Sequence, residues 1–353
     1  MFRVLFCLVL LIAQSVEAKR VLVAGGAGFL GSHLCERLLE RGDEVVCLDN
    51  LMTGSLRNIK SHKENPNFSF IDCDICEFTD SYHHYDEIYN LACPASPKKY
   101  QKDPLHTLRT NFIGTMNLLE IAKRNRAKFF QTSTSEVYGN PTQHPQPESY
   151  FGHVNPIGIR ACYDEGKRVA ETLCFEYYRQ HGVAIKVVRI FNTYGPNMSP
   201  TDGRVVSNFI IQALTNQPIT IYGDGSQTRS FCFVDDLIDG FLTFMDSDDN
   251  VTGPINLGNP MEVTVGELAE KIVAMTASRS VVHYLPLPQD DPVRRKPDLT
   301  TAQMSLGWNP YTSLTDGLGK TIHYFREQLR LQEKDKKRSL LGSCHEDNLS
   351  FTL

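Results

Sequence analysis

Short apolar runs alternate with amphipathic segments from Lys19 to about Ile190. The apolar runs fall at residues 21–24, 45–48, 68–71, 88–91, 128–132 and 184–190. Regular alternation of this kind predicts βαβ units, and therefore a parallel sheet with helices on both faces. We expect an α/β fold with a doubly wound sheet, in which ligands gather at the carboxyl ends of the strands.

The pattern becomes irregular and rich in proline beyond Ile190. Short helical patterns remain around 204–216, 234–246 and 264–276. We therefore predict a first domain at 19–190 and a smaller C-terminal substrate-binding lobe at 191–329, with some segments returning to the first domain. Residues 330–353 are polar and highly charged, which is typical of a disordered tail.

The first residues have the pattern of a targeting segment. Arg3 precedes an apolar run over 4–13, and small residues follow near Ala18. Residues 1–18 are therefore expected to be a signal peptide or signal anchor, and only a retained anchor would hold the chain at a membrane. The alternative is a mispredicted start with the protein beginning near Lys19, which would leave a cytoplasmic enzyme.

Closely spaced glycines follow the first apolar run. Gly25, Gly28 and Gly31 let a strand turn sharply, approach a pyrophosphate and pack against the next helix. An acid, Asp49, ends the second run eighteen residues after Gly31. Since such an acid accepts hydrogen bonds from a ribose and repels a 2′-phosphate, the sequence predicts a Rossmann-type site that prefers NAD to NADP.

Composition and charge exclude several classes of protein and leave the predicted α/β fold unchanged. The 353 residues carry a formal net charge of −5, which argues against a nucleic-acid binder. The ten cysteines lie mostly in apolar patterns, which does not suggest a disulfide framework. Cys73 and Cys76 form a C-x-x-C without a second pair at zinc-ligand spacing, so we expect structural cysteines and no metal.

Candidate chemistry follows the fifth apolar run. Thr134, Ser135 and Glu136 stand at its carboxyl end, and Tyr163 and Lys167 share one helical face at i and i+4. An ammonium one turn from a phenol would lower the pKa of the phenol toward neutrality for acid–base work on an alcohol. The alternative is an ordinary surface Tyr–Lys pair.

These motifs together resemble the extended short-chain dehydrogenase/reductases that act on nucleotide sugars. Over about residues 20–329 the resemblance is specifically to the UDP-glucuronic acid decarboxylase family. The stretches that carry it are residues 132–139, 153–156, 160–168, 189–196, 202–209 and 290–298. Two positions depart from the family pattern: Cys93 replaces a serine and Arg109 replaces a lysine.

The resemblance implies a reaction in which UDP-glucuronate is oxidised at C4 by NAD, loses CO₂ and is reduced again to UDP-xylose. It implies catalytic roles for Thr134, Glu136, Tyr163, Lys167 and Arg295. The implied cofactor contacts are Gly25, Gly28, Phe29, Leu30, Gly31, Asp49, Asn50, Thr53, Gly54, Asp74, Ile75, Leu91, Tyr163 and Lys167. The implied substrate contacts are Ser135, Asn192, Arg204, Arg229 and Arg295.

Glu136 and Arg295 are the residues that favour decarboxylation, because the resemblance places both beside the sugar carboxylate. Each has a plainer alternative, a structural hydrogen bond for Glu136 and a surface cation for Arg295. A nucleotide-sugar 4-epimerase, a 4,6-dehydratase and a non-catalytic NAD sensor remain alternatives, although Ser135 replaces the acid of the dehydratases. The resemblance further implies a homodimer and, with the leader, a place in the Golgi lumen.

Overall fold

The computed structural model describes residues 18–286 and 294–346, so the expected leader lies almost wholly outside them. A seven-stranded sheet in the order β11-β6-β5-β4-β1-β2-β3 forms the centre of the fold, and every pairing in it is parallel. Its strands are β1 (Arg20–Ala24), β2 (Glu44–Asp49), β3 (Phe68–Asp72), β4 (Glu87–Asn90), β5 (Lys128–Thr134), β6 (Ile185–Ile190) and β11 (Ile255–Leu257). The predicted parallel sheet is confirmed.

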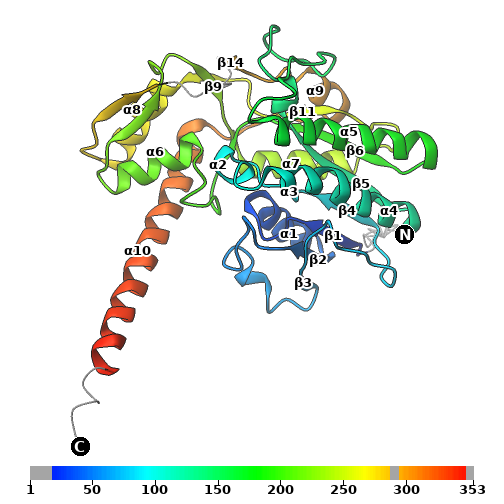
Figure 1. The fold of residues 1–353 in the computed structure, drawn as a ribbon, viewed down its shortest axis with the longest axis horizontal. Helices are drawn as coiled ribbons and strands as arrows, with labels where there is room; N and C mark the ends of the chain where they lie inside the picture. Colours follow the sequence, from blue (N-terminus) through cyan, green and yellow to red (C-terminus); the bar gives the residue numbers. More distant parts are fainter. Residues whose placement is uncertain (1–17, 287–293, 347–353) are drawn as a thin grey trace, which may run out of the picture.

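Helices cover both faces of this sheet (Figure 1). Alternate residues of β1 explain why: Val21 and Val23 join one buried cluster, whereas Leu22 and Ala24 join another on the opposite face. The helices of the first face are α1 (Phe29–Arg41) and α7 (Val234–Met245). The second face carries α4 (Thr115–Asn125) and α5 (Ala161–His181), with α3 (Pro104–Arg109) joined to α4 by a π-helical turn (Thr110–Gly114).

The strand order reverses between β1 and β4, because β1 continues to β2 and β3 while β4 continues toward β5 and β6. Diverging connections of this kind leave a crevice at the carboxyl ends of the strands, where doubly wound proteins bind ligands. The short elements at that edge are α2 (Pro97–Tyr100), the 3-10 turn η3 (Ser135–Tyr138) and the pair of β7 (Thr193–Tyr194) with β10 (Cys232–Phe233). A 3-10 turn η1 (Lys60–His62) precedes β3.

A smaller group of elements from the second half of the chain stands beside the main sheet (Figure 1). It contains a three-stranded sheet, a two-stranded sheet and a packed helix pair. Its members are α6 (Val205–Leu214), β8 (Ile219–Tyr222), β9 (Thr228–Ser230), β12 (Glu262–Thr264), α8 (Val265–Thr276), β13 (Val282–Leu285) and β14 (Arg294–Arg295). The segments α7 and β11 return to the main sheet, and α9 (Thr300–Leu306) packs against β11.

The last helix, α10 (Leu314–Glu346), continues far beyond the body of the molecule (Figure 1). Its first part packs against the rest of the protein through three buried side chains, those of Leu318, Ile322 and Phe325. Beyond them the residues are mostly good helix formers, and Arg330 pairs with Glu327 one turn earlier. The structure therefore differs from the disordered tail expected from residue 330, since the chain stays helical to Glu346; residues 347–353 lie outside the described part.

Candidate active site

One cavity of about 890 Å³ opens at the carboxyl ends of the strands, between the main sheet and the smaller group of elements. It is lined by every site residue that the sequence predicted, from both the cofactor and the substrate sets. These residues are Gly25, Gly28, Phe29, Leu30, Gly31, Asp49, Asn50, Thr53, Gly54, Asp74, Ile75, Leu91, Thr134, Ser135, Glu136, Tyr163, Lys167, Asn192, Arg204, Arg229 and Arg295. The fold thus brings together residues from distant parts of the chain.

The turn between β1 and α1 is closed by glycines. Gly25 has a φ of +79°, which side chains rarely adopt, and its N–H donates to Leu48 O at 2.7 Å. A Cβ on Gly31 would lie 2.1 Å from Gly25 O, so any side chain there would collide with the turn. Gly28 and the first residues of α1 line the cavity, and the unpaired N–H groups of a first helical turn suit an anion such as a pyrophosphate.

Asp49 ends β2 beside this turn. Its carboxylate accepts backbone hydrogen bonds from Ala27 at 3.1 Å and from Leu51 at 2.8 Å. Burial outweighs these bonds and raises the pKa of Asp49. A carboxylate has about four lone-pair sites, so acceptor capacity remains for a ribose hydroxyl in the cavity.

Tyr163 and Lys167 lie on the inner face of α5 and are both buried. The Lys167 Nζ donates to Thr132 O at 3.0 Å and lies 5.9 Å from the centre of the Tyr163 ring. The Tyr100 ring stacks on the Tyr163 ring, with ring centres 4.9 Å apart and an interplanar angle of 4°. The pair is therefore a packed component of the cavity wall and not a surface pair.

The expected lowering of the phenol pKa is wrong for the protein as described. Burial raises the pKa of Tyr163, and Cys93 adds to this, although the Thr134 hydroxyl lowers it. Lys167 directs its ammonium at a backbone carbonyl, and burial lowers the pKa of this ammonium as well. Removal from water destabilises both charged forms more than the lysine helps the phenolate.

Thr134 and Glu136 begin the turn η3 at the end of β5. The Thr134 hydroxyl accepts the Glu136 N–H at 3.2 Å and so caps this turn. The Glu136 carboxylate then faces Arg160 Nη2 at 2.7 Å and Arg295 Nη2 at 3.4 Å. Burial would raise the pKa of Glu136, but Arg295, Arg160 and Arg229 outweigh it and lower the pKa.

We call Glu136, Arg160, Arg229 and Arg295 the arginine cluster. Arg295 is 2% exposed and donates to Ser135 O and, at 3.1 Å, to Gly139 O. The expectation of a surface cation at Arg295 is therefore wrong. The guanidinium groups of this cluster line the cavity, where their forked donors suit an anionic ligand.

Sequence reasoning assigned no role to Arg160, although it stands only three residues before Tyr163. That spacing places it at the N-terminal end of α5, where its guanidinium reaches Glu136. Asp164 is also buried in this region. Burial and the charge of Glu136 raise the pKa of Asp164 to about 7.

The other predicted substrate residues also line the cavity. Both oxygens of Asp202 accept hydrogen bonds from Arg204, at 2.5 and 3.1 Å. Burial lowers the pKa of Arg204, but this ion pair outweighs burial and raises it, so the guanidinium stays charged. Arg229 donates to Thr228 O at 2.9 Å, and the Asn192 carbonyl accepts a backbone bond from Cys232.

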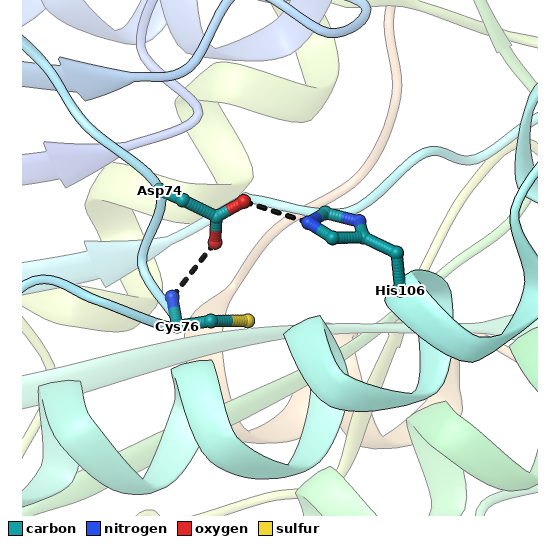
Figure 2. A group of neighbouring side chains, drawn as sticks. All are labelled: Asp74, Cys76 and His106. Carbon is teal, nitrogen blue, oxygen red and sulfur yellow. Dashed lines mark hydrogen bonds and ion pairs between the residues drawn. The ribbon is translucent and has the colours of Figure 1, made fainter.

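A further group lies at the cofactor end of the cavity. Asp74, in the loop after β3, accepts from Asn50 Nδ2 at 2.8 Å and faces His106 Nε2 at 2.7 Å. Figure 2 shows one Asp74 oxygen facing His106 and the other facing the backbone nitrogen of Cys76. The sequence assigned no role to His106, because nothing in the spacing from residue 74 to residue 106 indicates contact.

The structure also bears on the predictions for the cysteines and for the leader. The eight cysteines at residues 18–286 all carry free thiols, which confirms that they form no disulfide framework. In the part of the chain that the structure describes, no helix combines the length and apolar character that crossing a membrane requires. The leader expected at residues 1–18 lies outside that part except for Ala18, so it stays a prediction.

Comparison with known proteins identifies close relatives. Residues 21–258 match the NAD dependent epimerase/dehydratase family. UDP-glucuronic acid decarboxylase 1 of Danio rerio is 52% identical over 320 residues, which cover 91% of this chain and 76% of the relative. UDP-glucuronic acid decarboxylase 5 of Arabidopsis thaliana is 52% identical over 311 residues, which cover 88% of this chain and 90% of the relative.

Solved structures agree with this fold. UDP-glucuronic acid 4-epimerase from Bacillus cereus, in complex with UDP-glucuronic acid and NAD, has a TM-score of 0.79 at 30% identity, covering 88% of this chain and 99% of that chain. UDP-glucose 4-epimerase from Thermotoga maritima has a TM-score of 0.80 at 31% identity, with the same coverage. The chain belongs to the NAD dependent epimerase/dehydratase family and, within it, to the UDP-glucuronic acid decarboxylases.

Proposed function

We propose that this protein converts UDP-glucuronate into UDP-xylose and CO₂ and that NAD is its recycled cofactor. The observation that carries the proposal is the arginine cluster in the same cavity as Tyr163 and Lys167. Its guanidinium groups line the cavity and suit a substrate that bears a carboxylate, and the decarboxylase relatives support this choice of substrate. The 4-epimerase likeness makes epimerisation the second candidate.

The cavity wall fits a dinucleotide at the end formed by β1, α1 and β2. Side-chain-free glycines allow close approach of a pyrophosphate, and Asp49 offers acceptors for a ribose. NAD held there would supply the hydride acceptor for C4 of the sugar and the hydride donor for the later reduction. We assign the cofactor contacts to the residues predicted for it, with Asp49 as the group that selects against a 2′-phosphate.

Tyr163 takes the proton from the sugar 4-hydroxyl, assisted by the neighbouring Thr134. The positive charges of bound NAD⁺ and of Lys167 would oppose the burial that raises the pKa of Tyr163 and so favour its phenolate. Lys167 uses one N–H for Thr132 O, which leaves two donors for the ribose of the cofactor. Once C4 is a ketone, its oxygen accepts the electrons released as the C5 carboxylate leaves as CO₂. Thr134 and Tyr163 stabilise the resulting enolate oxygen until C5 takes up a proton.

Arg295 and Glu136 serve the loss of CO₂. Arg295 steers and holds the carboxylate, and Glu136 sets the geometry of Arg295 and Arg160 through their shared ion pairs. Ser135, Asn192, Arg204 and Arg229 hold the remainder of the nucleotide sugar. Arginine suits the diphosphate because its forked donors match phosphate oxygens.

Incubation of the purified full chain with UDP-glucuronate labelled at the carboxyl carbon tests the proposal. The expected result is labelled CO₂ together with an equal amount of UDP-xylose. Formation of UDP-galacturonate without CO₂ would identify an epimerase. A protein that retains NAD but converts neither UDP-glucuronate nor another nucleotide sugar would support the non-catalytic alternative.

We further propose a homodimer. Leu105, Leu108 and Phe112 are 73%, 38% and 45% exposed on α3 and the π-helical turn, beside α5. A second copy of the chain would bury this apolar stripe. Light scattering at the monomer mass would contradict the assembly.

For location we propose the secretory pathway, on the strength of the leader pattern at residues 1–18. The sequons at Asn67 and Asn250 are exposed and would then accept glycans. A mobility shift after endoglycosidase treatment is expected. Purely cytosolic fractionation would favour the cytoplasmic alternative.

A further inference from the structure

Asp74, Cys76 and His106 bring three different metal-binding atoms to one place (Figure 2). A carboxylate oxygen, a thiol sulfur and an imidazole nitrogen all lie within 4.8 Å of one another. Asp74 and Cys76 come from the loop after β3, whereas His106 comes from α3. The three residues are neither fully buried nor fully exposed, so an ion could reach them from solvent.

His106 faces a partner with each ring nitrogen. The Thr110 hydroxyl donates to His106 O at 2.8 Å, and its oxygen lies 3.4 Å from His106 Nδ1. His106 Nε2 lies 2.7 Å from Asp74 Oδ2, a distance at which one proton joins the two atoms. A metal ion in place of this proton would be bound by both atoms, with the Nδ1–H directed at Thr110.

We propose that these three side chains form a zinc site with one open position for water. Nitrogen, sulfur and oxygen ligands around a tetrahedral centre are the set that Zn²⁺ takes in proteins. Ligand atoms at about 2.0–2.3 Å from zinc lie roughly 3.3–3.7 Å apart, so Asp74 and His106 need to separate by only a fraction of an ångström. Thr110 supplies the outer hydrogen bond that orients a metal-binding imidazole.

Charge and protons also balance in this site. Zinc binding forms a Zn–S bond and releases the proton of the Cys76 thiol. The complex then joins Zn²⁺, one thiolate, one carboxylate and one neutral imidazole, which leaves no net charge.

The site overlaps the nucleotide end of the cavity. Asp74 and His106 both line the cavity, and Asn50 donates to the same Asp74 oxygen that faces His106. Because Asp74 and Asn50 are among the cofactor contacts assigned under the proposed function, zinc bound here excludes NAD. The metal site itself does not depend on that function, whereas the competition does.

Titration of the full chain, first freed of bound NAD, with Co²⁺ in a phosphine reductant tests the metal site without substrate. Cobalt bound to Cys76 should give a thiolate charge-transfer absorption, and Zn²⁺ should displace it. Cys76→Ser should abolish this absorption, and His106→Gln should weaken Zn²⁺ binding at least about tenfold. Cys73→Ser is the matched control, since this nearby thiol lies outside the cluster, and it should retain both properties.

The same titration with added NAD⁺ tests the competition. Competitive binding requires that NAD⁺ at a hundred times its own Kd weakens apparent Zn²⁺ affinity about hundredfold. Absence of the absorption in the unaltered protein, or its persistence in Cys76→Ser, would overturn the zinc site. Unchanged or tighter Zn²⁺ binding in the presence of bound NAD⁺ would overturn the competition, and failure to form UDP-xylose would bear only on the proposed function.

Discussion

The two ends of the cavity are built by different kinds of interaction. The nucleotide end takes Gly25 from the turn after β1, Gly31 from α1 and Asp49 from β2, which follow one another in the chain. The arginine cluster takes Glu136 from the turn after β5 and Arg295 from β14, residues 159 positions apart in the chain. The first end follows from local backbone geometry, whereas the second forms only when the smaller group of elements closes on the main sheet.

This difference predicts which property a substitution at each end of the cavity should affect. A change at the nucleotide end should disturb the backbone of the β1–α1 turn and with it cofactor binding. A change in the arginine cluster should leave the turn and the cofactor in place and should affect the step that needs the substrate carboxylate. The following changes test that separation, from the largest expected effect to the smallest.

Tyr163→Phe removes the proton acceptor on which the reaction depends, whichever end of the cavity is considered. Loss of general acid–base catalysis should reduce UDP-xylose formation about a thousandfold, because the C4 hydroxyl then keeps its proton. Stopped-flow absorbance of NADH should show no transient reduction of the cofactor. Tyr178→Phe, at a partly exposed position of the same helix, should behave like the unaltered protein; normal transient NADH in Tyr163→Phe would contradict the assigned role.

Arg295→Ala tests whether the arginine cluster acts on CO₂ release without affecting cofactor binding at the nucleotide end. Loss of a charged partner in a buried site should reduce CO₂ release about a hundredfold, while the NAD content of the purified protein stays unchanged. Glu136→Gln should lower CO₂ release similarly without creating a cavity. Arg294→Ala is the control, because this neighbouring arginine is exposed. Normal CO₂ release in both Arg295→Ala and Glu136→Gln would refute the step-specific roles.

Gly31→Ala tests the local geometry of the turn. The added Cβ would lie 2.1 Å from Gly25 O, so the turn must shift, and we expect a loss of about 1–3 kcal/mol in the free energy of unfolding. Urea unfolding and NAD titration measure the two consequences. Gly266→Ala also adds a methyl group to the first turn of a helix, but its nearest neighbour is at 3.5 Å, and it should be tolerated. Equal stability of the two variants would contradict this account.

Of these substitutions, Asp49→Ala should have the smallest effect, a change in the preference for NAD over NADP. The substitution removes acceptors for the ribose and the charge that repels a 2′-phosphate, so the preference for NAD over NADP should narrow about tenfold. Isothermal titration with each cofactor measures it. Asp72→Ala is the control because Asp72 is the register partner of Asp49 at the end of β3 and is exposed. Equal affinities for NAD and NADP in the unaltered protein would remove the basis of this prediction.

Most of the main sheet and the nucleotide end could be predicted from the sequence. Period-two and helical patterns reflect which face of an element is buried, and the glycine spacing reflects local backbone requirements. The Tyr163–Lys167 pairing likewise follows from helical geometry within a single element. These features depend on neighbours in the chain, so the order of residues contains them directly.

Contacts between distant segments were decided only by the tertiary structure. Some return of the C-terminal half to the main sheet was expected, but the sequence did not show that α7 and β11 are the segments that return. The contacts of Arg160 with Glu136 and of His106 with Asp74 have no periodic signal either. The pKa of Tyr163 shows the same limit, because spacing placed a lysine nearby while burial determined the direction of the shift. Periodicity tells which side of an element is buried, but the partner that covers it, and the water that it excludes, depend on how the whole chain packs.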